Sequence, residues 1–227
     1  PFILMNDDFS DPDSGWEESS LEDAIVGYQD GGYVVKAFSD GNYAWGVAGV
    51  DYQDIRIEVE VDVLETPSNQ NDAFGVDCRI QENGDGYGFR ISSDGKAAIV
   101  VSIDQHDVFL VEYSFNEAVY TDGRSNHLTA ICQGDHFEFL VNDVFVAETV
   151  DATFANGDVA LSAVTFESEP VSVKFDDIII QELGNPYAYA DPDSEPAAEG
   201  ELWLTISNPT SKEVCHVFIV PSEDDFW

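Results

Sequence analysis

Apolar and polar side chains alternate with a period of two along most of this chain. Residues 54–65, DIRIEVEVDVLE, show the pattern most clearly, because apolar residues at the odd positions alternate with charged ones. Such alternation is typical of a strand with one face in a core and the other in solvent. The side chains that we expect to point inward are Ile55, Ile57, Val59, Val61 and Val63.

Two later segments, residues 72–81 and 136–143, repeat this pattern. The expected inward residues are Phe74, Val76, Cys78 and Ile80 in the first segment and Phe137, Phe139 and Val141 in the second. No window of a dozen residues sustains the period of 3.6 that an amphipathic helix requires. The sequence therefore predicts an all-β protein.

Turn signals follow one another at short intervals. The clearest are QDGG at 29–32, SSDG at 92–95 and VNDV at 141–144, each between two apolar segments. Short strands separated by such turns are typical of two packed antiparallel sheets. We expect eleven to thirteen strands before residue 183, in a single β-sandwich spanning 1–183.

The composition changes after Leu183. Residues 184–200 are acidic and contain three prolines, which is typical of a linker. Residues 201–227 contain two further strand-like segments, which are too few for an independent domain. They are expected either to dock on the sandwich as a β appendix or to begin a second small β module.

The chain is strongly acidic. Its 46 Asp and Glu residues against 8 Lys and Arg give a net charge of −38. Such a surface repels phosphate backbones and anionic lipid, so nucleic-acid binding and membrane-surface binding are both disfavoured. No apolar stretch is long enough to span a membrane. The acidity is explained either by solubility alone or by a divalent cation bound at one of the Asp clusters.

Four segments, in this order, resemble the concanavalin A-like jelly-roll domains. They are DDFSDPDSGW at 7–16, GVDCRIQENGDGYGFRISSDGKAAI at 75–99, NHLTAICQGDHFEFLVND at 126–143 and GDVALSAVTFESEPVSVKFDDIII at 157–180. The likeness covers about residues 3–183 and is greatest to the secreted group related to 3-keto-disaccharide hydrolase-like and laminin-G-like modules. It implies a jelly roll whose first strand lies beside its last.

This arrangement would account for the acidic and aromatic opening segment. Phe9 and Trp16 would be buried, and the aspartates would lie outside. In the last strand, Asp176–Asp177 interrupts the alternation, which predicts a β-bulge that re-aims a carboxylate. In related glucanases, acids at the positions of Asp8 and Asp176 share a structural Ca²⁺, so the resemblance implies a calcium site there. The alternative is two solvated aspartates.

The resemblance also implies a glycan-binding face. Tyr43 and Trp45 share one face of a strand, and the family likeness adds Arg79 and Tyr87. Arg90 has the opposite parity to Tyr87, so only one of the two is expected to face a ligand. The alternative is that the aromatic rings belong to the core and that the arginines pair with nearby acids.

No catalytic signature is present. The E-x-D-x-x-E motif of the related glucanases is absent, and the alternating Glu58, Glu60 and Asp62 are ordinary for a solvent-facing strand. No Ser or Cys nucleophile lies in a recognisable motif. We therefore predict no catalytic residues.

Cys78 and Cys132 resemble a paired position in the secreted group, which implies a disulfide. Two buried thiols are the alternative, since free cysteine is itself a core residue. Cys215 would then have no partner among the remaining residues.

The predicted function is a non-catalytic carbohydrate-binding or adhesive module, extracellular or at the cell surface, with structural Ca²⁺ as its only expected cofactor. Its partners would be a glycan or neighbouring copies of a surface protein. Two alternatives stay open. One is a structural subunit of a surface layer or filament, and the other is a glycan-cleaving enzyme of the 3-keto-disaccharide hydrolase type.

Overall fold

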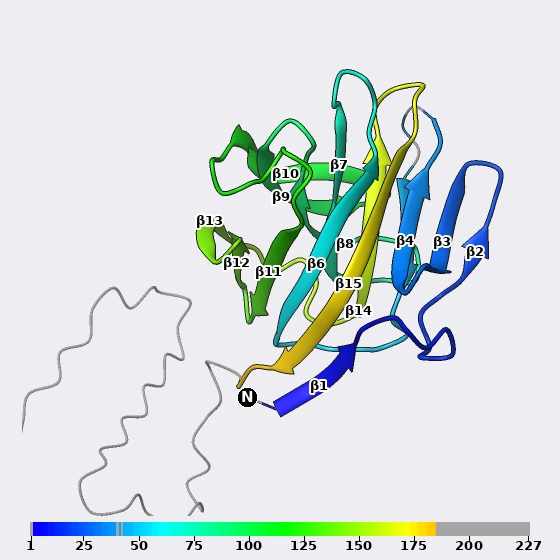
Figure 1. The fold of residues 1–227 in the computed structure, drawn as a ribbon. Helices are drawn as coiled ribbons and strands as arrows, with labels where there is room; N and C mark the ends of the chain where they lie inside the picture. Colours follow the sequence, from blue (N-terminus) through cyan, green and yellow to red (C-terminus); the bar gives the residue numbers. More distant parts are fainter. Residues whose placement is uncertain (1, 40, 42, 185–227) are drawn as a thin grey trace, which may run out of the picture. The chain divides into compact units, whose positions relative to one another are not determined.

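The computed structural model describes residues 2–39, 41 and 43–184. Over these residues the chain forms fifteen strands and no helix, arranged as two antiparallel sheets packed face to face (Figure 1). The predicted all-β jelly-roll sandwich is confirmed, with more strands than the turn signals indicated. Apart from Gly184, the expected linker and the expected C-terminal β segment lie outside the described residues.

One sheet has nine strands. Its order is β13-β12-β11-β6-β15-β4-β3-β2, and β1 pairs with β15. The strands are β1 (Phe2–Asp7), β2 (Ser19–Ser20), β3 (Ala24–Gln29), β4 (Gly32–Ala37), β6 (Ile55–Glu65), β11 (Asn126–Gln133), β12 (His136–Val141), β13 (Val144–Val150) and β15 (Val171–Glu182). The two longest, β6 and β15, run side by side through its middle (Figure 1).

The other sheet has six strands in the order β10-β9-β8-β7-β14-β5. They are β5 (Tyr43–Val47), β7 (Asp72–Ile80), β8 (Gly86–Ile91), β9 (Lys96–Ile103), β10 (His106–Phe115) and β14 (Asp158–Thr165). β10 and β5 are the two edge strands, so each face of this sheet extends from the β9–β10 hairpin at one edge to β5 at the other. The candidate site lies on the outer side of this sheet.

The core lies between the sheets and is built from alternate positions of the strands, as the sequence pattern predicts. The expected inward residues of β7 and β12 are buried, and so are Ile55, Ile57, Val59 and Val61 of β6. Val63 differs, because 38% of its surface is exposed. The pairing of β15 with β6 shifts register beside Val63, where the regular alternation ends.

The opening segment is fixed as the sequence predicts. β1 pairs with β15, with Asp7 opposite Ile178, so the first strand lies beside the last (Figure 1). Phe9 and Trp16 are 1% and 4% exposed, and their ring centroids are 5.5 Å apart. The predicted bulge at Asp176–Asp177 is also present, because the β15–β6 register shifts there and Asp177 takes a φ of 50°.

A disulfide joins the two sheets. The sulfur atoms of Cys78 in β7 and Cys132 in β11 lie 2.12 Å apart, and the two cysteines are 54 residues apart in sequence. Both residues occupy inward positions, so the bridge crosses the core.

The described part of the chain has no helical segment of the length and apolarity that crossing a membrane requires.

Candidate functional site

Two hollows open on the outer side of the six-stranded sheet, and Trp45 lines both of them. We call them the Tyr43 hollow, of about 520 Å³, and the Glu17 hollow, of about 540 Å³. Together they form what we call the Trp45 cleft. Trp45 is 38% exposed, so its ring is accessible where the two hollows adjoin.

The local sequence of β5 forces this aromatic pair outward. Ala44 and Gly46 face the core, where a Cβ atom on Gly46 would lie 1.8 Å from the Tyr33 hydroxyl oxygen, so only glycine fits. The alternating positions, Tyr43 and Trp45, therefore face away from the core. Their ring centroids are 5.3 Å apart with planes inclined by 37°, which makes a continuous aromatic shelf.

The Tyr43 hollow is mostly apolar at the shelf and polar on the opposite wall. It is lined by Gly41, Tyr43, Trp45, Asn83, Gly84, Ser102, Gln105, His106, Asp107, Val164 and Phe166. Its walls come from β5, β14, the β7–β8 turn and the β9–β10 hairpin. A concave apolar surface with a few polar groups is the usual form of a small-ligand site.

Asp85 holds two walls of this hollow together. Its carboxylate accepts hydrogen bonds from the backbone N–H groups of Asp104 and Gln105, both at 2.9 Å. It also accepts one from the side-chain amide of Asn83 at 2.8 Å. Burial opposes ionisation of Asp85, but these hydrogen bonds outweigh it and lower the pKa of its carboxyl group.

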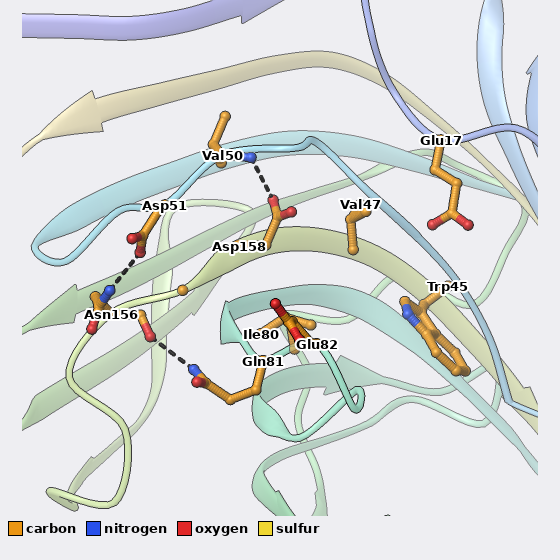
Figure 2. Close-up of a pocket in the computed structure, with 11 residues that line it drawn as sticks. Glu17, Trp45, Val47, Val50, Asp51, Ile80, Gln81, Glu82, Asn156 and Asp158 are labelled. Carbon is orange, nitrogen blue, oxygen red and sulfur yellow. Dashed lines mark hydrogen bonds between the residues drawn. The ribbon is translucent and has the colours of Figure 1, made fainter.

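The Glu17 hollow is strongly acidic (Figure 2). Asp158 accepts backbone hydrogen bonds from Gly49 and Val50, and Asp51 accepts one from the Asn156 amide. These two carboxylates therefore shape the walls. Two further acids, Glu17 and Glu82, also line the hollow. Their carboxylates form no hydrogen bond or ion pair with the residues that the structure describes.

Between the shelf and β8 lies a buried polar network. Arg90 in β8 forms an ion pair with Asp77 in β7, with Nη2 and Oδ1 2.5 Å apart, and it donates to the Tyr43 hydroxyl group. The side chains of Arg90 and Asp77 are 4% and 1% exposed. Burial alone would lower the pKa of Arg90, but Asp77 together with Tyr43, Asp107 and Tyr113 outweighs it, so that pKa is raised and the guanidinium stays charged. Burial also raises the pKa of the Tyr43 hydroxyl.

The structure corrects the placement of Arg79, whose side chain is 1% exposed. β7 has an extra residue relative to β14 at this point, and Arg79 takes a φ of 55°, so it leaves the alternation. Its guanidinium is turned between the sheets, where it donates to the carbonyl groups of Gly134 and Phe154 and pairs with Asp54. It has no access to a ligand on the outer face.

Tyr87 is corrected in the same way. It is fully buried, and its ring lies 4.1 Å, centroid to centroid, from that of Phe137 in the opposite sheet. Its hydroxyl donates to Asp151 at 2.6 Å, and burial raises its pKa to about 12. Tyr87 and Arg90 lie on opposite faces of β8, and Arg90 is the one on the outer face of the six-stranded sheet.

Asp8 follows the last residue of β1, Asp7, which is opposite Ile178 of β15, and Asp176 lies two residues before Ile178 in the middle of β15. Asp8 is exposed, and Asp176 interacts with Lys174 at 3.5 Å. Over the described residues, no three or more His, Cys, Asp and Glu side chains group closely enough to hold a metal ion. The calcium site stays a prediction.

Known proteins resemble this chain in structure and not detectably in sequence. No model of a known protein family matches it, and no curated protein matches it in sequence. The carbohydrate-binding module CBM66 from Bacillus subtilis superposes with a TM-score of 0.60 at 16% identity, covering 74% of this chain and 96% of that one. This chain has the concanavalin-type jelly-roll fold.

Two further structures share the fold. A prokaryotic β-1,3-1,4-glucanase (lichenase) derived from a mouse hindgut metagenome has a TM-score of 0.58 at 11% identity, covering 79% of this chain and 99% of that one. A Bacillus subtilis protein of unknown function with a galectin-like fold has a TM-score of 0.59 at 11% identity, covering 80% and 96%. At such identities the likeness establishes the fold alone.

Proposed function

We propose that this chain is a non-catalytic carbohydrate-binding module and that glycans bind in the Trp45 cleft. The observation that carries the proposal is the exposed Trp45 ring, which adjoins Tyr43 and is shared by two hollows. The apolar C–H faces of a sugar ring pack on such aromatic surfaces, while polar wall groups hydrogen-bond its hydroxyls.

The comparisons support a role with carbohydrates in general terms. One protein of the same fold is named as a carbohydrate-binding module and another as a glucanase. Extracellular location is part of the proposal and is supported by the Cys78–Cys132 disulfide, because such bonds persist in oxidising surroundings. The finer relation to 3-keto-disaccharide hydrolase-like and laminin-G-like modules belongs to the proposal as well.

The absence of catalysis is proposed on chemical grounds. Glycoside hydrolysis generally needs two carboxyl groups that flank the scissile bond. In the network beside the shelf, the carboxylate of Asp77 is 1% exposed and ion-paired with Arg90, so it has no free path to a leaving group. The sequence also lacks the E-x-D-x-x-E strand motif of the related glucanases.

The test is binding of the 227-residue chain to a glycan array, followed by calorimetry with the best-binding oligosaccharide. Trp45→Ala should abolish binding or weaken it at least about tenfold, since truncation of a central tryptophan anchor costs on the order of 2 kcal/mol or more. Phe145→Ala is the matched control, because Phe145 is an exposed aromatic residue of β13 in the other sheet. The Phe145→Ala variant should bind the oligosaccharide with the affinity of the wild type.

Other outcomes would favour the alternatives. Release of reducing sugar from a bound glycan, lost on mutation of a cleft carboxylate, would favour a glycan-cleaving enzyme. No glycan binding together with concentration-dependent assembly would favour a structural subunit of a surface layer or filament.

A further inference from the structure

The guanidinium of Arg90 has an unused hydrogen-bond donor. Three buried side-chain polar atoms lack a partner among the described residues, namely Arg90 Nη1, Trp16 Nε1 and Thr129 Oγ1. Arg90 Nη1 is the charged one, and an unpaired donor on a charged group is the most costly to bury. Such a group calls for an explanation, which can be a functional role or a bound water or ion.

The head group of Arg90 lies against the Tyr43 hydroxyl, and Arg90 is not itself among the residues that line the Tyr43 hollow. Arg90 is paired with Ala98 along β9, but its guanidinium lies over Gly88, where a Cβ atom would be 2.6 Å from Cζ and 2.8 Å from Nη1. Gly88 pairs with Val100, which is two residues nearer to Ser102, a residue that lines the hollow. Glycine at position 88 therefore makes room for the guanidinium to extend along the sheet in the direction of Ser102.

The shelf residue Tyr43 joins this donor to the hollow. Its hydroxyl accepts from Arg90 Nη2, the Arg90 Cζ atom lies 5.4 Å from its ring centroid, and the same ring lines the hollow. A sugar seated on the shelf at Tyr43 is thus next to the guanidinium. The aromatic ring of Tyr43 and the planar guanidinium of Arg90 therefore lie together at one end of the cleft.

The charge around Arg90 indicates the class of sugar. Asp77 already neutralises the guanidinium, and Asp107, which lines the hollow, also acts on it. No Lys or Arg is among the described residues that line either hollow, whereas Glu17, Asp51, Glu82 and Asp158 line the Glu17 hollow. Carboxylated or sulfated sugars would meet uncompensated negative charge there.

We propose that Arg90 is the polar anchor of the Trp45 cleft and that it selects uncharged glycans. Nη1 donates a hydrogen bond to a hydroxyl oxygen of a neutral sugar ring that stacks on Tyr43 and Trp45. This inference rests on the proposed function and adds to it a specific residue and a specific ligand class. Asp77 acts as a positioning residue, because it holds the guanidinium without needing to touch the sugar.

A ligand reaches Nη1 only if a wall side chain moves slightly, because the Arg90 side chain is 4% exposed. This wall belongs to β10, a strand that is suited to such a movement. It is an edge strand, its pairing with β9 shifts register twice, and Asp107 and Tyr113 of this strand both act on Arg90. Edge strands with such irregularities yield more easily than central ones.

The test measures binding of neutral cello-, laminari-, xylo- and mannohexaose, each beside its C6-carboxylated form where C6 exists, to the 227-residue chain. We expect at least one neutral hexaose to bind and its carboxylated form to bind at least about tenfold more weakly. Arg90→Lys keeps the charge beside Asp77 and removes the fork of donors, so it should weaken the neutral ligand about tenfold or more.

Arg79→Lys is the matched control, because Arg79 is the other buried arginine paired with an aspartate and it lies between the sheets. Its folded fraction should bind within about twofold of wild type. Should Arg90→Lys fail to fold, Gly88→Ala provides a second variant, since the added methyl group displaces the guanidinium and should weaken binding in the same direction.

The outcomes separate this inference from the proposed function. Binding by none of the glycans would overturn both. Binding that is lost in Trp45→Ala but unchanged in Arg90→Lys would overturn the role of Arg90 and leave the module intact. Preference for the carboxylated sugars would overturn the ligand class.

Discussion

Arg79 and Arg90 show that the same residue type has different roles in two environments. Each is a buried arginine beside an aspartate. The guanidinium of Arg79 donates to the carbonyl groups of Gln53, Gly134 and Phe154, so it ties three loops together. That of Arg90 keeps one donor unused and contacts Tyr43, which lines the Tyr43 hollow. Hydrogen-bond satisfaction, and not burial, distinguishes a structural arginine from a candidate ligand contact.

At the same scale, Asp85 connects a pKa to the shape of the cleft. We expect Asp85→Asn to lower the free energy of unfolding by about 1–2 kcal/mol, because a charged acceptor of two partly buried backbone hydrogen bonds is replaced. Asp122→Asn is the control, since Asp122 is exposed and pairs with an exposed arginine, Arg124. Urea unfolding at neutral pH measures both.

The pH dependence of the Asp85 effect has a definite sign. The folded pKa of Asp85 is lowered, so its stabilisation is present above the unfolded pKa of about 4 and is lost as pH falls through the folded value. The difference between wild type and Asp85→Asn should therefore shrink in acid below about pH 4. A difference that grows on acidification would contradict this role.

At the scale of strands, alternation alone predicted most of the fold. Apart from Val63, it identified the inward residues of β6, β7 and β12, and the interruption at Asp176–Asp177 predicted the bulge that the structure contains. The same rule placed Tyr43 and Trp45 on one face of a strand, and the structure shows that this face is the outer one. These successes share one cause, since a strand of regular register places every second side chain on one face.

The failures also have a strand-level cause. Arg79 lies at a bulge that the local sequence does not predict, because no glycine or pair of acidic residues is present there. Tyr87 was assigned outward by family likeness, although its parity with the apolar Phe89 already favoured the core. Arg90 was passed over because the likeness favoured Tyr87, and Asp77 was missed because charged residues on an outer face are normally solvated. Gly88, beside Arg90, was the available signal.

The disulfide between β7 and β11 is the clearest strand-level prediction. Replacing both Cys78 and Cys132 with alanine should lower the free energy of unfolding by about 2–4 kcal/mol, because the bridge closes a long loop in the unfolded chain. Guanidinium unfolding measures the change, with dithiothreitol-treated wild type expected to match the variant. Equal stability of oxidised and reduced wild type would contradict a bridge that crosses the core.

For the whole molecule, net charge is the dominant feature. A charge of −38 on 227 residues opposes compaction through self-repulsion, and added salt screens that repulsion. We expect Tm to rise by several degrees when NaCl is increased from about 0.02 M to about 0.5 M, with most of the gain below about 0.2 M. A Tm that is constant or falls over this range would contradict net repulsion.

The same titration examines the predicted calcium site. At matched ionic strength, CaCl₂ and MgCl₂ should screen general repulsion to similar extents. A further increase in Tm that Ca²⁺ produces and Mg²⁺ does not, and that disappears in Asp8→Asn, would support ion binding at Asp8 and Asp176, where β1 pairs with β15. Equal effects of the two cations would contradict such a site.

The most direct test of glycan binding in the Trp45 cleft is a two-dimensional ¹⁵N-resolved NMR titration with the best-binding neutral oligosaccharide. The account predicts saturable shifts at the Trp45 indole N–H and at the backbone amides of Tyr43, Gly84 and Ser102, which line the Tyr43 hollow. It predicts no shift at Phe145 in the other sheet. Shifts centred on the nine-stranded sheet, or none anywhere with a glycan in excess, would contradict it.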